Sequence, residues 1–255
     1  MRVMTFNIRF ENTSDGANAW LHRKDLVAEI IMRYRPEVVG TQEGKWNQLV
    51  DLQDRLPSYL LHAPGRLIDD TCQYPTLFLL KEPFKVLEGD ELWLSETPRV
   101  HRSKSWDSGF PRMMSYARLK RAGSDRTIWA CVTHLDHLGP EARIRQASIV
   151  SEWASSLDEP FILMGDFNDG PDSETHAILT SQKTRLRDTW QVLGLFEGPQ
   201  SATSHGFTGI PKKERIDWVL ASPEFLIREA SIIRDDFEGR YPSDHFPYKA
   251  DLDLP

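Results

Sequence analysis

Residues 159–170 join an apolar run to polar side chains of the kinds that enzymes use. The run, residues 161–164, has four large apolar residues without alternation and ends at Gly165, which predicts a short strand buried on both faces. Asp166 and Asn168 follow it closely. Proteins built on sheets often bind ligands at the ends of strands, so this carboxylate and this amide are candidate catalytic groups. Asp and Asn also favour turns and helix caps, and this segment alone does not separate the two interpretations.

Polar groups stand at the ends of other apolar runs in the same way. The further members of this set are Asn7, Glu43, His134, Asp217, Asp244 and His245. The first three follow their runs, whereas the last three stand at or near the start of theirs. If all of them line one edge, some strands run up and others down, which predicts mixed sheets. The oxygen donors suit Mg²⁺, with Mn²⁺ as the alternative, because these cations take few carboxylates and complete their coordination with water and substrate phosphate.

Each member of this set also has an ordinary structural interpretation. His134 could be a hydrogen-bonded core histidine, Glu43 an acid at a helix start, and Asp217 a partner for Arg215. What favours a shared site is the position that the members have in common, at the ends of predicted buried strands.

The elements that must position these groups follow from the apolar spacing. We predict helices over 20–35, 46–56, 140–157 and 173–179, the first two ended by Pro36 and Pro57. We predict strands over 3–6, 38–41, 77–80, 85–87, 92–94, 115–119, 127–133, 161–164, 215–220, 226–233 and 248–252. Turns are expected at Glu82-Pro83 and Gly89-Asp90, the latter between 85–87 and 92–94. Two adjacent strand pairs are expected: 115–119 with 127–133, and 215–220 with 226–233 around Ser222-Pro223. This order predicts two packed sheets with helices outside.

A long segment without regular pattern spans residues 97–113. It holds four cations, Arg99, Arg102, Lys104 and Arg112, with one acid, Asp107, and the aromatic residues Trp106 and Phe110. Irregular loops of this length are often functional. The segment is either a solvated basic loop or a wall that faces an anion and offers aromatic rings for stacking.

Composition limits the class of protein. The 255 residues are 40% hydrophobic and contain no low-complexity linker, so we expect one domain, residues 1–255. A net charge of −7 argues against coating long nucleic acid, but it allows a local basic pocket. The two cysteines form no metal motif, no leader is evident, and no apolar stretch approaches the roughly 18 residues of a membrane span. We therefore expect a cytoplasmic protein with no membrane partner.

Six motifs together resemble one enzyme family. They are T-F-N-I-R at 5–9, T-Q-E at 41–43, T-H-L-D-H at 133–137, G-D-F-N at 165–168, R-I-D-W-V at 215–219 and Y-P-S-D-H-F-P at 241–247. In this order and spacing they resemble the endonuclease/exonuclease/phosphatase family, whose fold is deoxyribonuclease-I-like. The resemblance implies a four-layer α/β sandwich of two mixed sheets flanked by helices. The segments W-L-S-E-T-P at 93–98 and S-W-D at 105–107 resemble a bacterial hydrolase subset of the family.

The resemblance also implies roles at a metal. Glu43 would be the principal Mg²⁺ ligand, Asn7 would lie at the metal or the phosphate, and Asp244 would reach the same cluster. Arg9 stands where DNA-repair members usually carry an acid or an amide, which weakens an abasic-endonuclease interpretation. Arg9 and Arg112 are candidate substrate contacts, with ion pairs to neighbouring acids as the alternative.

Five residues receive catalytic roles from the resemblance. Asp166 would orient or deprotonate the attacking water, and Asn168 would position it against phosphorus. His245, held by Asp217, and His134 from the opposite side would each bond a non-bridging phosphate oxygen. A carboxylate beside an imidazole favours its charged form, which suits the stabilisation of a phosphorane.

The expected activity is Mg²⁺-dependent hydrolysis of a small or terminal phosphate ester by direct in-line attack of water. The main alternative is a nuclease or DNA-end phosphodiesterase acting on nucleic acid. Gly165-Asp166 with Asp169 also fits the G-D-x-x-D of binuclear metallophosphoesterases, but the D-x-H and G-N-H motifs of that class are missing. A scaffold that has lost its chemistry would be expected to have lost one of the catalytic residues, and all of them are present.

Overall fold

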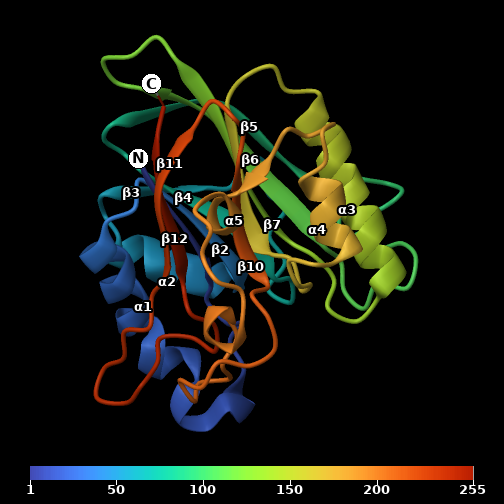
Figure 1. Cartoon of the computed structure of the whole chain (residues 1–255). Helices are drawn as coiled ribbons and strands as arrows, with labels where there is room; N and C mark the ends of the chain where they lie inside the picture. The colour runs from blue at the N-terminus through green and yellow to red at the C-terminus, as the bar shows by residue number, and fades with distance from the viewer. Residues whose placement is uncertain (255) are drawn as a thin grey trace.

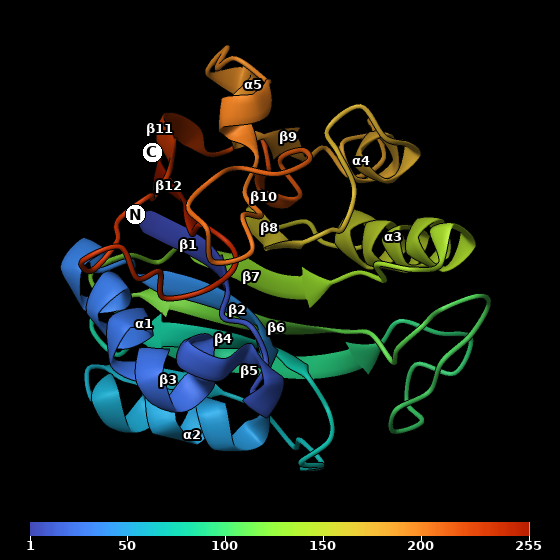
Figure 2. The same ribbon diagram turned by 90° about the horizontal axis from the view of Figure 1, so that it is seen from below.

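Two six-stranded sheets pack face to face between layers of helices in the computed structural model, which describes residues 1–254 (Figures 1 and 2). The first sheet has the order β11-β12-β1-β2-β4-β3, and the second has the order β5-β6-β7-β8-β10-β9. Only the pairs β1–β2 and β7–β8 are parallel among the described strands. The predicted mixed sheets are confirmed.

The element bounds are as follows. The first sheet contains β1 (Arg2–Asn7), β2 (Val38–Gly44), β3 (Tyr59–His62), β4 (Tyr74–Leu80), β11 (Leu226–Ile232) and β12 (Tyr248–Asp253). The second contains β5 (Phe84–Trp93), β6 (Met113–Arg121), β7 (Thr127–His134), β8 (Phe161–Asp166), β9 (Arg187–Asp188) and β10 (Asp217–Ala221). The α-helices are α1 (Trp20–Tyr34), α2 (Trp46–Arg55), α3 (Pro140–Ser155), α4 (Glu174–Leu179) and α5 (Thr189–Val192), and short 3-10 helices span Thr13–Asn18 and Pro199–Ser201.

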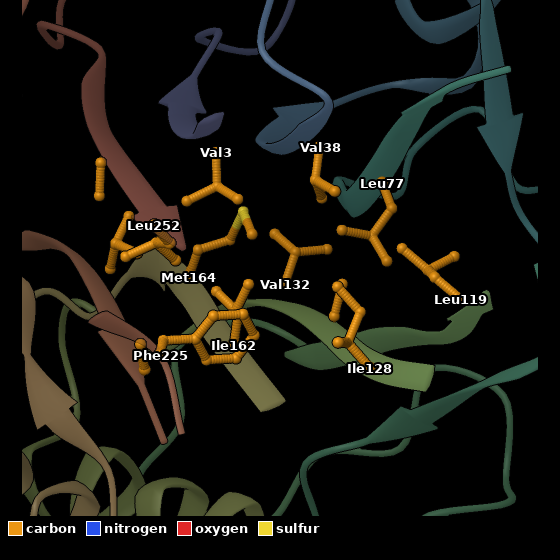
Figure 3. Packing of buried hydrophobic residues seen from close by; sticks show 14 of the residues in the cluster. Val3, Val38, Leu77, Leu119, Ile128, Val132, Ile162, Met164, Phe225 and Leu252 are labelled. Atoms are coloured by element: carbon orange, nitrogen blue, oxygen red, sulfur yellow. The ribbon is translucent and has the colours of Figure 1, made fainter. Parts of the chain in front are cut away.

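The core between the sheets explains why the central strands are apolar on both faces. Val3 and Val38 of the first sheet meet Val132 and Met164 of the second in one buried cluster (Figure 3). The sheets come so close that a Cβ on Gly40 would lie 2.7 Å from Met164 Cγ. A larger residue at this position would force the two sheets apart.

The outer faces of the sheets are covered by amphipathic helices. Val27 and Leu49, from α1 and α2, pack with Val39 against the first sheet. Val150 of α3 and Leu179 of α4 pack against the second sheet in a separate cluster. The predicted helices and the four-layer order are confirmed, because the apolar stripe of each helix must be buried on a sheet.

Two predicted strand arrangements were wrong. Gly89-Asp90 makes no turn, because β5 runs through it unbroken and pairs with β6 along its whole length. Gly89 is instead a packing glycine, since a Cβ there would lie 2.6 Å from the Tyr116 carbonyl oxygen. The strands around Ser222-Pro223 do not pair with each other: β10 joins β8 and β9, whereas β11 joins β12 in the other sheet.

A buried ion network joins β9 of the second sheet to α4 and to the segment before β10. Asp188 Oδ2 accepts hydrogen bonds from His176 Nε2 at 2.9 Å and from Arg215 Nη2 at 2.8 Å, and the side chains of both Asp188 and Arg215 are fully buried. Burial alone would raise the pKa of Asp188, but the His176 bond and the Arg215 charge hold it below its ordinary value. Arg215 therefore pairs with Asp188 and Glu197 rather than with Asp217.

We expect Asp188→Asn to lower the free energy of unfolding by about 1.5–3 kcal/mol at neutral pH, because it removes one of the two carboxylates that pair with the buried Arg215 guanidinium and leaves only Glu197. A lowered carboxyl pKa contributes stability above the unfolded value and loses it as pH falls through the folded value. The difference between wild type and variant should therefore shrink below about pH 4. Urea unfolding across pH measures this, with Asp253→Asn, from an exposed pair with Arg228, as the matched control. A loss that stays the same at every pH would contradict the assignment.

No helix within residues 1–254 has the length and apolarity needed to cross a membrane.

Candidate active site

The strand pairing brings polar side chains of the second sheet to one edge. Asp166 ends β8, and in the register of the sheet it faces His134 of parallel β7 on one side and Asp217 of antiparallel β10 on the other. This is why Asp217 stands at the start of its apolar run and the other two stand at the ends of theirs. Opposite strand directions put all three at the same edge.

Asn7 links this edge to the first sheet. Its Nδ2 donates to Asp166 Oδ2 at 2.9 Å and to Glu43 Oε1 at 3.2 Å. Glu43 and Arg9 have φ values of 66° and 54°, a left-handed conformation that such residues rarely adopt. Asn168, across the site, has φ 53°. Strained backbone of this kind gathers where the surrounding structure holds side chains in place for function.

The predicted residues surround a pocket of about 640 Å³. Its lining includes eight of the ten predicted residues: Arg9, Glu43, Arg112, His134, Asp166, Asn168, Asp244 and His245. The other two lie just behind this lining: Asn7 donates a hydrogen bond to Asp166, and Asp217 accepts one from His245. All ten therefore come together at one place.

Asp217 and His245 form a close buried pair. His245 Nδ1 lies 2.8 Å from Asp217 Oδ2 and 3.9 Å from Asp166 Oδ2. Burial alone would lower the pKa of His245, but the charge and hydrogen bond of Asp217 raise it well above the ordinary value. An imidazole held in its charged form can donate from Nε2 to an anion.

Asp166 combines burial with crowding by other carboxylates. Its desolvation, together with the negative charge of Asp217, raises the pKa of Asp166 to about 7. A carboxylate with this pKa can accept a proton near neutral pH, as a general base must. Its Oδ1 accepts from the backbone N–H of Asn168 at 3.0 Å, which fixes the direction of the carboxylate.

Arg112 and Arg9 are both engaged in ion pairs. Arg112 is buried, its Nε lies 3.4 Å from Asp136 Oδ2, and its Nη1 donates to His134 Nδ1 at 3.0 Å. Burial and the neighbouring Arg112 charge lower the pKa of His134 well below the ordinary value, so this imidazole is neutral. Arg9 pairs with Asp15 at 3.1 Å. The alternative of ion pairs is thus present for both arginines, although both also line the pocket.

Of the four cations in loop 97–113, only Arg112 lines the pocket. Arg99 pairs with Asp90 and Arg102 pairs with Asp69, both at the exposed surface. Phe110 and Arg112 are the residues of this loop that line the pocket. The wall interpretation was wrong for Arg99 and Arg102, because Asp90 of β5 and Asp69 of a neighbouring loop hold them.

Several lining residues were missed from the sequence. They are Phe10, Lys45, Thr71, Gln73, His137, Lys213 and Ile216. His137 ends the motif T-H-L-D-H, and its place three residues after His134 was the one available signal. The lysines carried no pattern that distinguishes them from surface residues.

The donor set fits a hard divalent cation. Glu43 and Asp244 present carboxylate oxygens to the pocket, and Asn7 lies within 3.2 Å of Glu43. Asp217 Oδ1 is buried without a hydrogen-bond partner among the described residues, and Asp166 is crowded by like charge. Asp166, Asp217 and His245 place ligand atoms within 4.8 Å of one another, but His245 and Asp217 already bond each other. Excess negative charge beside oxygen donors is what a cation such as Mg²⁺ would balance.

Comparison with known proteins agrees with this geometry. No curated protein matched. Among solved structures, an endonuclease/exonuclease/phosphatase family protein from Bacteroides vulgatus is 31% identical with a TM-score of 0.89, covering 100% of this chain and 98% of that one. A family protein from Bacteroides thetaiotaomicron is 30% identical with a TM-score of 0.89, covering 99% and 97%. A mannosyl-6-phosphatase from the same species is 29% identical with a TM-score of 0.87, covering 99% of both chains.

A sequence model of one protein family matches nearly the whole chain. The model described as the Endonuclease/Exonuclease/phosphatase family matches residues 4–245, and these bounds span all six motifs apart from the last two residues of the sixth. The two mixed sheets flanked by helices are the deoxyribonuclease-I-like fold that the motifs predicted. The chain belongs to the endonuclease/exonuclease/phosphatase family.

Proposed function

We propose that this protein is a Mg²⁺-dependent hydrolase that cleaves a small or terminal phosphate ester by direct in-line attack of water. The observation that carries the proposal is the joining of a carboxyl of raised pKa, Asp166, with the Asp217–His245 pair in one pocket. A pocket of about 640 Å³ has the size of small-molecule sites. The 29% identical relative described as a mannosyl-6-phosphatase supports a small phosphomonoester.

In the proposed mechanism, Glu43, with Asn7 and Asp244 beside it, would hold Mg²⁺ or Mn²⁺. The cation would neutralise phosphate charge and polarise the phosphoryl group. Arg9 and Arg112 add positive charge to the pocket that receives the phosphate. The cation, Arg9 and Arg112 would together reduce the repulsion between an anionic substrate and a protein of net charge −7.

Proton transfer and charge stabilisation fall to the other polar residues. Asp166 accepts a proton from the attacking water, and Asn168 holds that water against phosphorus. The new bond joins the water oxygen to phosphorus, the bond to the ester oxygen breaks, and the alkoxide that leaves takes a proton from solvent water to become the alcohol. His245 would donate from Nε2 to a non-bridging oxygen, where negative charge grows in the transition state. His134 Nε2 lies 3.0 Å from Asn168 Nδ2 and would take the same role from the opposite side once substrate replaces that contact.

A terminal nucleotide or DNA end is the second candidate substrate. The observation that favours it is the presence of Lys45 and Lys213 beside Arg9 in the pocket lining. Cations in these positions would suit the further phosphates of a nucleic acid strand.

An assay with Mg²⁺ or EDTA over sugar phosphates, nucleotides, oligonucleotides and phosphodiesters tests the proposal. We expect release of inorganic phosphate from small monoesters, its loss in EDTA, and its recovery when excess Mg²⁺ or Mn²⁺ is added. Dominant cleavage of oligonucleotides that falls steeply with salt would favour the nuclease alternative. Equal turnover with and without EDTA would refute the metal-dependent mechanism.

We also propose that residues 1–255 act as one domain in the cytoplasm. Support for one domain comes from Asn7 and His245, which meet in the same site from opposite ends of the chain. Support for a reducing compartment comes from Cys72 and Cys131, which are both buried and free.

A further inference from the structure

The guanidinium of Arg112 holds two histidines at once. Its Nη1 lies 3.0 Å from His134 Nδ1, and its Nη2 lies 2.9 Å from His137 Nδ1. A guanidinium can donate hydrogen bonds but cannot accept them. Both imidazoles must therefore accept at Nδ1, and in the neutral form each carries its proton at Nε2.

Asp136 makes this arrangement rigid. Its buried carboxylate lies 3.4 Å from Arg112 Nε and accepts from the backbone N–H groups of Phe110 at 3.2 Å, Leu138 at 3.0 Å and Gly139 at 2.8 Å. It thereby joins the loop that carries Phe110 to the turn that carries His137. The rings of Phe110 and His137 stack at 5.6 Å between centroids with planes 25° apart. The pair is held in place before any substrate binds.

The residues that run from Asp166 to His137 along the pocket become more exposed to solvent. Asp166 is 1% exposed, His134 4% and Arg112 6%, whereas Phe110 is 48% exposed and His137 is also exposed. All of them line the same pocket. A substrate whose phosphate reaches Asp166 and His134 must extend its organic part outward, and the Phe110–His137 pair lines that outer part of the pocket.

The exposed position of His137 in the outer part of the pocket suits a partner on the organic group rather than the phosphate. Partial desolvation of its ring and the charge of Arg112 lower the pKa of His137, which favours the neutral imidazole at physiological pH. A neutral Nε2–H can donate one hydrogen bond to a hydroxyl oxygen. An aromatic pair beside it offers an apolar face to the carbon-bound hydrogens of a ring.

We propose that His137, oriented by Arg112 and stacked on Phe110, is a specificity-determining residue that recognises the organic part of the ester. Its Nε2–H donates to an oxygen of a neutral, hydroxyl-bearing ring such as a sugar, and the Phe110–His137 pair packs against that ring. The substrate class is therefore a phosphate ester of a compact polyhydroxylated ring. This inference rests on the proposed phosphoesterase function.

The test compares two phosphate esters that differ in the organic group. Mannose 6-phosphate offers hydroxyls, whereas phenyl phosphate offers a ring without them. We expect His137→Phe to lower kcat/KM for mannose 6-phosphate by about tenfold or more, mainly through KM, and to change phenyl phosphate by less than about threefold. His137→Gln should recover most of the loss, because its amide oxygen can accept from Arg112 while its N–H donates. His22→Phe, on the exposed surface of α1, is the matched control.

Other outcomes overturn the inference. Equal losses with both esters would mean that His137 acts at the phosphate or only supports the fold, and no loss with either would mean that it contacts no substrate. Calorimetric binding of both esters to wild type and to His137→Phe, with Mg²⁺ present, separates this inference from the proposed function. A preference for mannose 6-phosphate that His137→Phe abolishes would support the subsite even if neither ester is hydrolysed, and the absence of any such preference would refute it.

Discussion

Replacing Asp166 with asparagine should lower kcat for phosphate-ester hydrolysis by about 10³-fold or more, because it removes the proposed base for the attacking water. An amide cannot accept the proton of water, whereas the Asp166 carboxyl has a pKa of about 7 and is suited to do so near neutral pH. The fold should tolerate the change. Burial and the Asp217 charge already disfavour ionised Asp166, so we expect the free energy of unfolding to stay within about 1 kcal/mol of wild type. Steady-state kinetics and urea unfolding measure the two quantities.

Asp169→Asn is the matched control for this prediction. Asp169 lies on the same turn but pairs with Arg143 at 3.1 Å and accepts from Thr175 Oγ1 at 2.7 Å. A binuclear G-D-x-x-D site would need Asp169 as a ligand, so loss of activity in this variant would favour that class. Unchanged turnover in Asp166→Asn would refute the assigned role of Asp166.

We expect Asp217→Asn to lower kcat by about 10² to 10⁴, since the loss reaches about 10⁴ when an amide replaces the carboxylate that orients the catalytic histidine of a serine protease. The charge of Asp217 lies 2.8 Å from His245 Nδ1 and, with its hydrogen bond, outweighs the burial that disfavours imidazolium. A neutral amide at this position removes the largest of the charges that raise the pKa of His245, so the charged imidazole is less favoured and its Nε2–H stabilises the growing phosphate charge less. KM should change less than kcat, because the lost interaction is strongest in the transition state.

A double-mutant cycle isolates the pair. Asp217→Asn should add little to the loss caused by His245→Asn, since the carboxylate acts through the imidazole. Full additivity of the two losses would show that Asp217 acts independently of His245. Arg228→Gln, which breaks an exposed pair with Asp253, serves as the surface control.

Much of the fold was readable from local pattern. The apolar run of residues 161–164 is the buried centre of β8, and helix 20–35 ends beside Pro36 as expected, since the structure gives α1 as Trp20–Tyr34. These predictions succeeded because side-chain period and proline act within a few residues. The turn predicted at Gly89-Asp90 was wrong because the reason for a glycine there is not local. The contact that demands a glycine there comes from Tyr116 on the neighbouring strand and leaves no local trace in the sequence.

The candidate site likewise has features that the sequence shows and features that only the structure shows. The types and order of Asn7, Glu43, Asp166, Asp217 and His245 could be recognised from six short motifs, and all five residues meet in the structure. Their chemistry is local, because a carboxylate or an imidazole is written directly in the sequence. Their protonation states depend instead on residues that are distant in the chain. The raised pKa of Asp166 depends on its burial and on Asp217, which lies across a strand pair.

The sequence by itself therefore determined the family, the layer order and the identities of the polar residues at the strand ends. Tertiary structure alone decided which cations face the pocket: Asp90 of β5 and Asp69 of a neighbouring loop hold Arg99 and Arg102 away, while Lys45 and Lys213 line it. It also assigned β10 and β11 to different sheets and brought His137 beside Phe110. The physical reason is that strand partners, loop contacts and desolvation arise between residues distant in the chain, where no spacing rule operates.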